Sequence, residues 1–381
     1  MSVTQRPVTG REVLKNMHRT PAARRQPTRT KRVTARRKRT SHRRNHITAV
    51  LAAVGALVVL TAAAVGVYAF KGYGGESDTW VMIPRNATRE AVGDSIHSSL
   101  DNGGIAGRVV AMWRLMGGDA AVSAGAYKVK AGQSAFSIAR AISRGRQTPV
   151  TVTFGGTRTM DQLASRIAAQ LQCTPEEFLA ACDSILPPMG YERPEWYPAA
   201  FIPDTYEFYW SDSPANVVKR LVKYRDGFWT PERRAKAKSM GLTPVGVATI
   251  ASIVEEETAK SDERPKVARL YINRLDRGMK LQADPTVKFA LGDFSLRRIN
   301  HGHLSSPSPY NTYRVGGLPP GPIRVAEKSA LEAVLDAPRH NYIYMCAKED
   351  FSGYHNFAAD YSTHQANAAR YQAELNRRGI K

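Results

Sequence analysis

Three consecutive glutamates, Glu255, Glu256 and Glu257, are the residues of this sequence best suited to transfer a proton. They end a segment rich in Ile, Val and Ala, residues 244–258, which opens with a Thr-Pro pair typical of a helix start. At about 100° per residue, Glu257 falls at the centre of the apolar face, Glu256 on its flank and Glu255 opposite. We therefore expect Glu257 to be pushed toward the core and Glu255 to be solvated.

A partly buried carboxyl group without a strong counter-charge keeps its proton near neutral pH, because burial disfavours the charged form. Such a group can act as the general acid that cleaves an acetal or glycosidic bond. The alternative for Glu257 is a plain ion pair with Arg264 or Arg274 on a second predicted helix, residues 263–276. The residues alone leave both interpretations open.

Two loops that follow these helices carry polar and aromatic side chains. The first spans residues 281–286, and the second, residues 307–322, is stiffened by several prolines. Amides, hydroxyls and aromatic rings on such loops suit a sugar ligand, although ordinary turn chemistry is the alternative. The candidates on these loops, either for direct contact with the substrate or for support of the residues that contact it, are Gln282, Asp284, Thr286, Tyr310, Asn311, Thr312 and Tyr313.

Other signals of chemistry are weak. His301 and His303 are better interpreted as a loop pair than as metal ligands, since no acidic or cysteine partner lies nearby in sequence. There is no Gly-rich phosphate loop, no Cys-x-x-Cys, no Gly-x-Ser-x-Gly and no His-Glu-x-x-His. Three cysteines are too few for a disulfide-stapled scaffold. No metal or organic cofactor is therefore expected.

The elements that position these residues form an α+β protein. Residues 79–149 alternate short strand-like and helix-like stretches and predict a small α/β module, preceded by a linker over residues 71–78. Residues 150–381 form the larger mixed α/β domain that holds the glutamates. Residues 47–70 contain no charged side chain, and a bilayer core needs roughly 20 helical residues, so we expect a transmembrane helix here. A cleaved signal peptide is the less favoured alternative.

The positive charge of the chain is concentrated before this span. The net charge is +22, and residues 1–46 hold 15 Lys/Arg against one acid, so we expect a disordered basic tail on the cytoplasmic side. Contact with anionic lipid is a better role for the tail than nucleic-acid binding. The isoelectric point of about 10.1 therefore reflects the basic tail rather than the folded part of the chain. We expect no nucleic-acid partner for the protein as a whole.

The assembled motifs resemble those of the endolytic murein (peptidoglycan) lytic transglycosylases of the YceG-like or MltG family. The Glu-x-Glu-Thr sequence at residues 255–258 is the most specific of them. The family has a Pro-Glu-Gly turn after the strand that links its two domains. In this sequence that turn is absent, and Gly155 and Gly156 stand in its place. The matching blocks are residues 202–206, 251–258, 263–264, 273–275, 278–287, 308–313, 317–323 and 355–357, with His364.

The resemblance implies that Glu257, directly before Thr258, is the catalytic acid and that Asp204 and His355 join the loop residues near the substrate. It implies a single N-terminal transmembrane helix, a LysM-like subdomain over residues 79–149 and a catalytic domain over residues 150–381. The implied reaction cleaves the β-1,4 bond from N-acetylmuramic acid to N-acetylglucosamine without water and leaves 1,6-anhydro ends. The implied substrate is the nascent peptidoglycan glycan strand, the implied protein partners are the peptidoglycan synthases, and the catalytic domain would lie outside the cytoplasm on the bacterial cell membrane.

Three other functions remain open. A membrane-anchored peptidoglycan hydrolase would share Glu257 and add water, with Asp284 as its second carboxylate. A non-catalytic glycan-binding scaffold would use the same loops without cleavage. A membrane-tethered regulator would bind nucleic acid through residues 1–46, with an affinity that falls steeply with salt.

Overall fold

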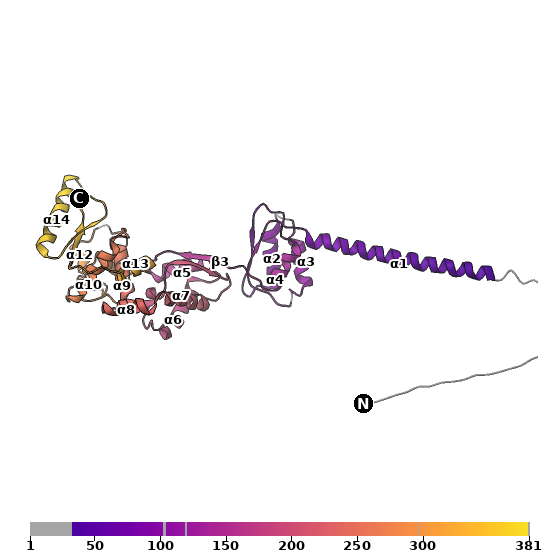
Figure 1. The fold of residues 1–381 in the computed structure, drawn as a ribbon, viewed down its shortest axis with the longest axis horizontal. Coiled ribbons are helices and arrows are strands. Elements are labelled where there is room, and N and C mark those ends of the chain that lie inside the picture. The colour runs from indigo at the N-terminus through magenta and orange to yellow at the C-terminus, as the bar shows by residue number, and fades with distance from the viewer. Residues whose placement is uncertain (1–32, 102–103, 119, 297, 380–381) are drawn as a thin grey trace, which may run out of the picture. The chain divides into compact units, whose positions relative to one another are not determined.

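The computed structural model describes residues 33–379, apart from residues 102–103, 119 and 297. The chain divides into two compact units at Val67 and Tyr68. The described part is mostly helical and holds three antiparallel sheets of two strands each, which agrees with an α+β protein that is rich in helix. Figure 1 shows the order of the elements along the chain.

The described part of the first unit belongs to a long helix, α1 (Val33–Phe70, 38 residues), whose last three residues fall in the second unit. Residues 43–70 of this helix are long and apolar enough to cross a membrane, and side chains such as Leu51 and Leu60 are exposed along it. The apolar helix was predicted, but its start was not, because residues 33–46 are helical rather than disordered. Arginine, lysine and alanine are good helix formers, so a helix that exists in the apolar segment can extend through them. Residues 1–32 of the expected tail lie outside the described residues.

The second unit begins with a small module around its own hydrophobic core. Strand β1 pairs antiparallel with β2, with Val81 opposite Tyr127, and helices cover the sheet. Trp113, Ile83 and Ile96 are fully buried in this core. The elements are β1 (Thr79–Ile83), α2 (Arg89–Leu100), α3 (Ala106–Leu115), β2 (Gly125–Val129) and α4 (Ala135–Ser143).

A second, larger core follows and starts with another strand pair. Strands β3 and β4 are antiparallel, with Val152 opposite Tyr206, and helices pack in sequence beside them. Helix α5 follows β3 after a short turn and ends at Ala168. The elements are β3 (Val150–Phe154), α5 (Met160–Ala168), α6 (Pro175–Ile185), η2 (Pro187–Met189), η3 (Pro194–Ala200), β4 (Asp204–Phe208), α7 (Pro214–Phe228) and α8 (Pro231–Ser239).

Helix α9 (Pro244–Glu257) lies at the centre of this core and ends at the three glutamates. Its predicted cap is confirmed, because the Thr243 side chain accepts a hydrogen bond of 3.0 Å from Gly246 N and Pro244 is in the first turn. Every residue from Gly246 to Glu255 is buried, so the helix has no solvated face. Helices pack around it: α10 (Arg264–Asp276), α11 (Asp284–Leu291) and α13 (Lys328–Leu335), while the short α12 (His301–Leu304) follows α11.

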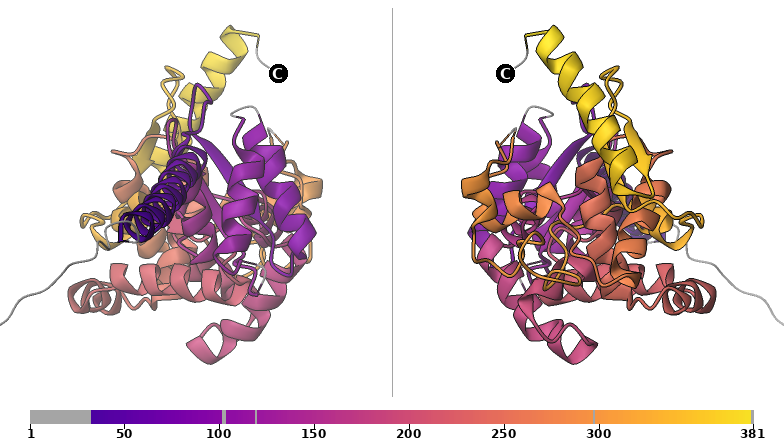
Figure 2. Two further views of the ribbon diagram at one scale, coloured as in Figure 1. Left: turned by 90° about the vertical axis from the view of Figure 1, so that its right-hand side faces the viewer. Right: turned by 90° about the vertical axis from the view of Figure 1, so that its left-hand side faces the viewer.

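The chain ends in a hairpin and a helix. Strand β5 (Tyr344–Ala347) pairs antiparallel with β6 (His355–Ala358). Helix α14 (Tyr361–Arg377), yellow in Figure 2, packs against both strands. Strand β5 and helix α14 supply one wall of the cavity described next.

Candidate active site

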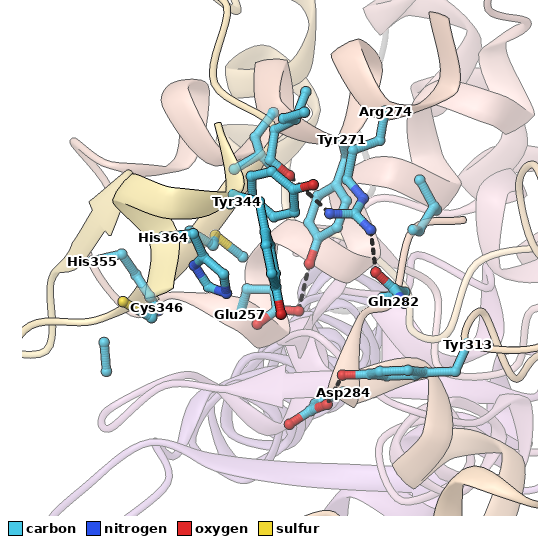
Figure 3. A pocket seen from close by; sticks show the side chains of 16 residues that line it. Glu257, Tyr271, Arg274, Gln282, Asp284, Tyr313, Tyr344, Cys346, His355 and His364 are labelled. Atoms are coloured by element: carbon cyan, nitrogen blue, oxygen red, sulfur yellow. Dashed lines mark hydrogen bonds between the residues drawn. The ribbon is translucent and has the colours of Figure 1, made fainter. Parts of the chain in front are cut away.

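A cavity of about 450 Å³ lies at the C-terminal end of α9 (Figure 3). Glu257 reaches it from the last turn of α9, and Tyr271 and Arg274 reach it from α10. The loop before α11 and the hairpin with α14 close the other sides. The lining residues are Glu257, Leu270, Tyr271, Arg274, Leu281, Gln282, Asp284, Tyr313, Ile343, Tyr344, Met345, Cys346, Ala347, His355, Tyr361 and His364.

The Glu257 carboxyl group is half-buried in this cavity and holds one strong hydrogen bond. The Tyr271 hydroxyl donates to Glu257 Oε1 over 2.6 Å. Burial raises the pKa of Glu257 to about 7, against the lowering effect of the Tyr271 hydrogen bond and with help from the negative charge of Asp284. A carboxyl group with this pKa exchanges its proton readily at neutral pH, as a general acid requires.

An ion pair for Glu257 was the alternative prediction, and the structure contradicts it for both arginines. Arg264 lies 3.5 Å from Glu327 and donates to Ser329 Oγ over 3.0 Å. Arg274 donates to the carbonyl oxygens of Ile343 and Lys280, each over 2.8 Å, and to Gln282. In the part of the chain that the structure describes, Glu257 has no ion-pair partner within 4.0 Å.

Glu255 is not solvated, so that prediction is wrong. The residue is only 8% exposed. Arg324 Nη2 lies 2.9 Å from its Oε1, and the backbone N–H of Glu327 donates to its Oε2 over 2.9 Å. Burial raises its pKa, and the charge of Arg324 opposes that rise. The helical-wheel argument failed here because the segment before α13 covers the side of α9 that the wheel assigned to solvent.

Glu256 shares Arg324 with Glu255 and adds a second arginine. Arg324 Nη1 lies 2.7 Å from Glu256 Oε1, and Arg158 binds both of its carboxylate oxygens over 3.1 Å. A Cβ atom on Gly156 would lie 2.1 Å from Arg324 Nη2. The glycine at this turn therefore makes room for the guanidinium group, and two of the three glutamates are held in ion pairs while Glu257 is not.

Three of the predicted loop residues line the cavity with Glu257. The Tyr313 hydroxyl donates to Asp284 Oδ1 over 2.6 Å, and both side chains face the cavity. Gln282 has a left-handed backbone (φ 52°), a costly conformation for a non-glycine residue. Its backbone N–H donates to Thr312 O over 3.2 Å, and its side chain accepts from Arg274. These contacts hold its side chain at the cavity.

Four other predicted loop residues do not line the cavity but support it. Thr312 Oγ1 accepts from Ala283 N over 3.0 Å and lies 2.8 Å from Thr286 Oγ1. Asn311 is fully buried and donates to the carbonyl oxygens of Leu304 and Ser306. Tyr310 packs on Phe289, with ring centroids 4.7 Å apart. These contacts hold the two loops together and support the residues that line the cavity.

Of the remaining predicted residues, His355 lines the cavity and Asp204 does not. His355 Nδ1 lies 2.7 Å from Glu263 Oε2, and its backbone N–H donates to Glu263 Oε1 over 2.8 Å. Thr258 donates to the same Glu263 over 3.2 Å, which ties the end of α9 to β6. Asp204 begins β4, where it accepts hydrogen bonds from Thr205 N and the Tyr224 hydroxyl.

Sequence reasoning missed most of the aromatic residues of the cavity. Tyr271 lies in the predicted helix 263–276 and is only 2% exposed, yet its hydroxyl faces Glu257. Tyr344 stacks on His364 at 5.1 Å with 17° between the rings, and Tyr361, 59% exposed, lies 5.8 Å from Tyr344. The signal that could have found Tyr271 is its polar tip within an otherwise apolar stripe.

The cavity combines the proton-exchanging carboxyl group of Glu257 with aromatic faces and with hydrogen-bonding side chains that include the charged Arg274 and Asp284. That combination suits acid-catalysed cleavage of a saccharide. Within the described residues, no three His, Cys, Asp or Glu side chains are placed together as a metal would need. His303 closes a capping box with Asn300 at the start of α12.

Comparison with known proteins places these features in a family context. The model of the YceG-like family matches residues 81–370. An endolytic murein transglycosylase of Bacillus subtilis is 29% identical over 252 residues, which cover 61% of this chain and 69% of the relative. One of Streptococcus pneumoniae is 30% identical over 173 residues, which cover 44% of this chain but only 31% of the relative. The crystal structure of a YceG-like protein from Listeria monocytogenes matches 77% of this chain and 99% of that chain with a TM-score of 0.51 at 24% identity, which is a likeness of fold.

Proposed function

The chain belongs to the YceG-like family, and we propose that it is a membrane-anchored endolytic transglycosylase that cleaves murein glycan strands. The name of the relatives supports the reaction class. The observation that carries the proposal for this chain is the Glu257 carboxyl group, with a pKa of about 7, in a cavity lined by aromatic and hydrogen-bonding side chains.

Glu257 is the proposed general acid. It donates its proton to the oxygen of the β-1,4 bond between N-acetylmuramic acid and N-acetylglucosamine. The bond between that oxygen and C1 of the muramic acid then breaks, and the N-acetylglucosamine end leaves as an alcohol. The proton comes from a group with a pKa of about 7, which is about half protonated at neutral pH, so no separate activation of the acid is needed.

The carboxylate that remains on Glu257 is the proposed base for the second half of the reaction. It accepts the proton of the 6-hydroxyl group on the same muramic acid ring, and O6 bonds to C1. The product is a 1,6-anhydro end, and Glu257 is protonated again without any water entering the balance. An intramolecular nucleophile replaces the second carboxylate of ordinary glycosidases. Tyr271 stabilises the carboxylate between the two steps through its hydrogen bond to Oε1.

The other cavity residues are proposed to hold the sugar. Gln282, Tyr313 and His355 offer hydrogen-bonding groups, and Tyr344 and Tyr361 offer ring faces. The buried loop residues, including Thr286 and Thr312, keep the loop before α11 in place. No metal or organic cofactor enters this mechanism.

Hydrolysis at the same site is a second candidate, because Asp284 also faces the cavity. Its carboxylate accepts a hydrogen bond of 2.6 Å from the Tyr313 hydroxyl. A glycosidase that inverts configuration places its two carboxyl groups about 6.5–9.5 Å apart, with a water molecule between them. Asp284 would be the base for that water, and the products would carry reducing ends.

Product analysis of uncrosslinked glycan strands tests both candidates. Wild type should release fragments with 1,6-anhydro ends, which mass spectrometry separates from reducing ends by the mass of one water. Glu257→Gln should lower the rate by about 10²–10⁴-fold, because it removes the proton donor and keeps the shape. Reducing ends from the wild type would support hydrolysis, and Asp284→Asn would then abolish it. No cleavage by a folded wild-type protein would support the non-catalytic glycan-binding scaffold.

The placement of the enzyme is part of the proposal. Helix α1 would anchor the chain in the bacterial cell membrane through residues 47–70, with the basic residues before it in the cytoplasm. The module over residues 79–149 and the catalytic domain over residues 150–381 would then meet nascent strands outside the cytoplasm. Cleavage there would terminate strand elongation beside the peptidoglycan synthases, its proposed partners.

A further inference from the structure

A second cavity, of about 620 Å³, lies beside α7 and the start of α13 and has no role in the proposed reaction. Half of its lining residues are cationic: Arg220, Lys223, Arg233 and Lys328. We call it the basic cavity. No aspartate or glutamate lines it. A concave site with this charge attracts anions, because low-dielectric walls strengthen the field inside a cleft.

Most of this positive charge is not neutralised. Arg233 is paired with Glu332 over 2.8 Å. Arg220, Lys223 and Lys328 form no ion pair among the described residues, and Arg220 instead lies 5.1 Å from the centre of the Phe208 ring. The hydrogen bond from the Tyr224 hydroxyl lowers the pKa of the Asp204 carboxyl group, and the charge of Lys328 adds a smaller lowering effect. Three cations are therefore free to bind a ligand.

The floor of the basic cavity is apolar. Phe228 lies under the Arg233 guanidinium group at 4.1 Å from its ring centre, and Ile202 is almost fully buried. Tyr224 forms part of the wall and is fixed there by Asp204. A ligand with carboxylates on short aliphatic side chains fits both the cations and this floor, whereas the neutral sugar rings of a glycan chain leave the cations unused.

The basic cavity is connected to the catalytic helix. Lys328 follows Glu327, whose backbone N–H donates to Glu255 Oε2 over 2.9 Å. Glu255 and Glu257 belong to the same last turn of α9. A helix with its side chains is about 10–12 Å in diameter, so Lys328 and the Glu257 cavity lie on two sides of one helix end.

We propose that the basic cavity binds the acidic peptide carried by a murein strand while Glu257 acts on the glycan. This inference rests on the proposed function for its substrate. Murein consists of glycan strands that bear short peptides with free carboxylates, and those carboxylates are its main negative charges. Binding of the peptide at Lys223 and Lys328 would make the enzyme prefer strands that still carry peptides.

Peptide binding can be measured without any cleavage. The probe is the N-acetylated murein tetrapeptide with its carboxylates free, titrated calorimetrically into the full-length protein in detergent. The double variant Lys223→Glu with Lys328→Glu should bind it at least about tenfold more weakly, because two ion pairs become two repulsions. The matched control is Lys219→Glu with Lys238→Glu, which makes the same change of charge at exposed positions outside the cavity. The control should bind like wild type.

Cleavage kinetics give the second measurement. Wild type should show a KM about tenfold lower for peptide-bearing strands than for the same strands stripped of peptide by an amidase and converted to methyl amides at the freed lactyl carboxylates, with similar kcat. The double variant should lose this difference and keep its kinetics on stripped strands. The wild-type preference should also weaken with added salt, since exposed ion pairs are screened.

The outcomes separate this inference from the proposed function. Strand cleavage without tetrapeptide binding, or with equal effects of the two double variants, overturns the basic cavity as a peptide site and leaves the enzyme intact. Equal binding of a tetrapeptide with amidated carboxylates also overturns it. Tetrapeptide binding that depends on Lys223 and Lys328, but no cleavage of either strand, supports the peptide site and overturns the transglycosylase.

Discussion

The proton of Glu257 is the feature on which the proposed chemistry depends, and one tyrosine controls it. Burial raises the pKa of Glu257 to about 7, and the hydrogen bond from Tyr271 limits that rise. The Tyr271 hydroxyl therefore stabilises the Glu257 carboxylate, and so it keeps the pKa of Glu257 low enough for the group to release its proton at neutral pH. The other two glutamates, Glu255 and Glu256, are paired with arginines instead.

Tyr271→Phe should move the high-pH limb of kcat/KM upward. Without the hydroxyl the carboxylate is less stable, so the pKa of Glu257 rises and the protonated form persists to higher pH. The measurement is the pH profile of glycan cleavage from pH 5 to pH 9. Tyr206→Phe is the control, because its hydroxyl donates to Ile202 O, away from Glu257. A limb that stays in place, or moves downward, would contradict the role given to Tyr271.

Glu257→Gln should stabilise the protein at alkaline pH. The folded pKa is about 7 and the ordinary value is 4.5, so between these pH values the folded state holds a proton that the unfolded state releases. Wild-type stability therefore falls as pH rises through that window. The variant should be more stable by about 1–3 kcal/mol at pH 8 and nearly equal to wild type at pH 4.

Thermal unfolding of the two proteins at both pH values measures this difference. Glu192→Gln, a change at an exposed glutamate, is the control and should alter stability by less than about 0.5 kcal/mol. If Glu257→Gln is as stable as wild type at pH 8, or less stable, the raised pKa is wrong.

At the scale of elements, ion pairs with two arginines hold the C-terminal turn of α9 in place. Arg324 contacts both Glu255 and Glu256, and Arg158 also contacts Glu256. These ion pairs fix the rotation of the last helical turn and so the direction in which Glu257 points. Glu255 and Glu256 thus position Glu257 in the active site, although neither of them lines the cavity.

Arg324→Ala should destabilise the protein by about 3 kcal/mol at pH 7, because it leaves the buried Glu255 without its counter-charge. Denaturant unfolding measures this loss of unfolding free energy. The loss should be smaller at pH 4, because more of the Glu255 carboxyl group is then protonated and needs no counter-charge. Adding Glu255→Gln to Arg324→Ala should restore part of the loss. Arg339→Ala, at an exposed position, is the control. Equal losses for the two arginine variants would contradict this arrangement.

How far the sequence predicts the site depends on the range of the interactions. The cap at Thr243, the helix of Glu257 and the helix of Tyr271 follow from local pattern, and the structure confirms them. The burial of Glu255 could not be predicted, because Arg324 lies far along the chain and an amphipathic pattern cannot reveal a helix covered on all sides. The loop residues were found, but sorting Tyr313 from Thr312 requires knowing which side chain faces the cavity.

At the scale of the whole molecule, helix α1 is a membrane anchor if the mature protein keeps it and a signal peptide if it is cleaved off. We expect the mature protein in cells to include residues 47–70, because the apolar segment is longer than the roughly 7–15 residues of a signal peptide core. Intact mass spectrometry of the protein extracted from membranes gives the answer. A mature chain that begins after Phe70 would mean that α1 is a cleaved signal.

Helix α1 also shows a limit of composition as a predictor. The apolar segment was identified because a charge-free run is a strong and local signal. The helical start at Val33 was missed because arginine-rich sequence is read as disordered by its charge, while the same residues are good helix formers next to an existing helix.

The cavity around Glu257 is completed by the last part of the chain, since Tyr344, His355, Tyr361 and His364 all follow the acid by many residues. If the chain is exported with α1 leading, α9 reaches the wall before the hairpin and α14 do. Under the proposed function, a chain still in transit would therefore carry the acid without the complete cavity that raises its pKa, and it would not yet cleave the glycan strands around it. Because the residues that complete the cavity follow Glu257 in the chain, the proposed cleavage of glycan strands would begin only after translocation has ended.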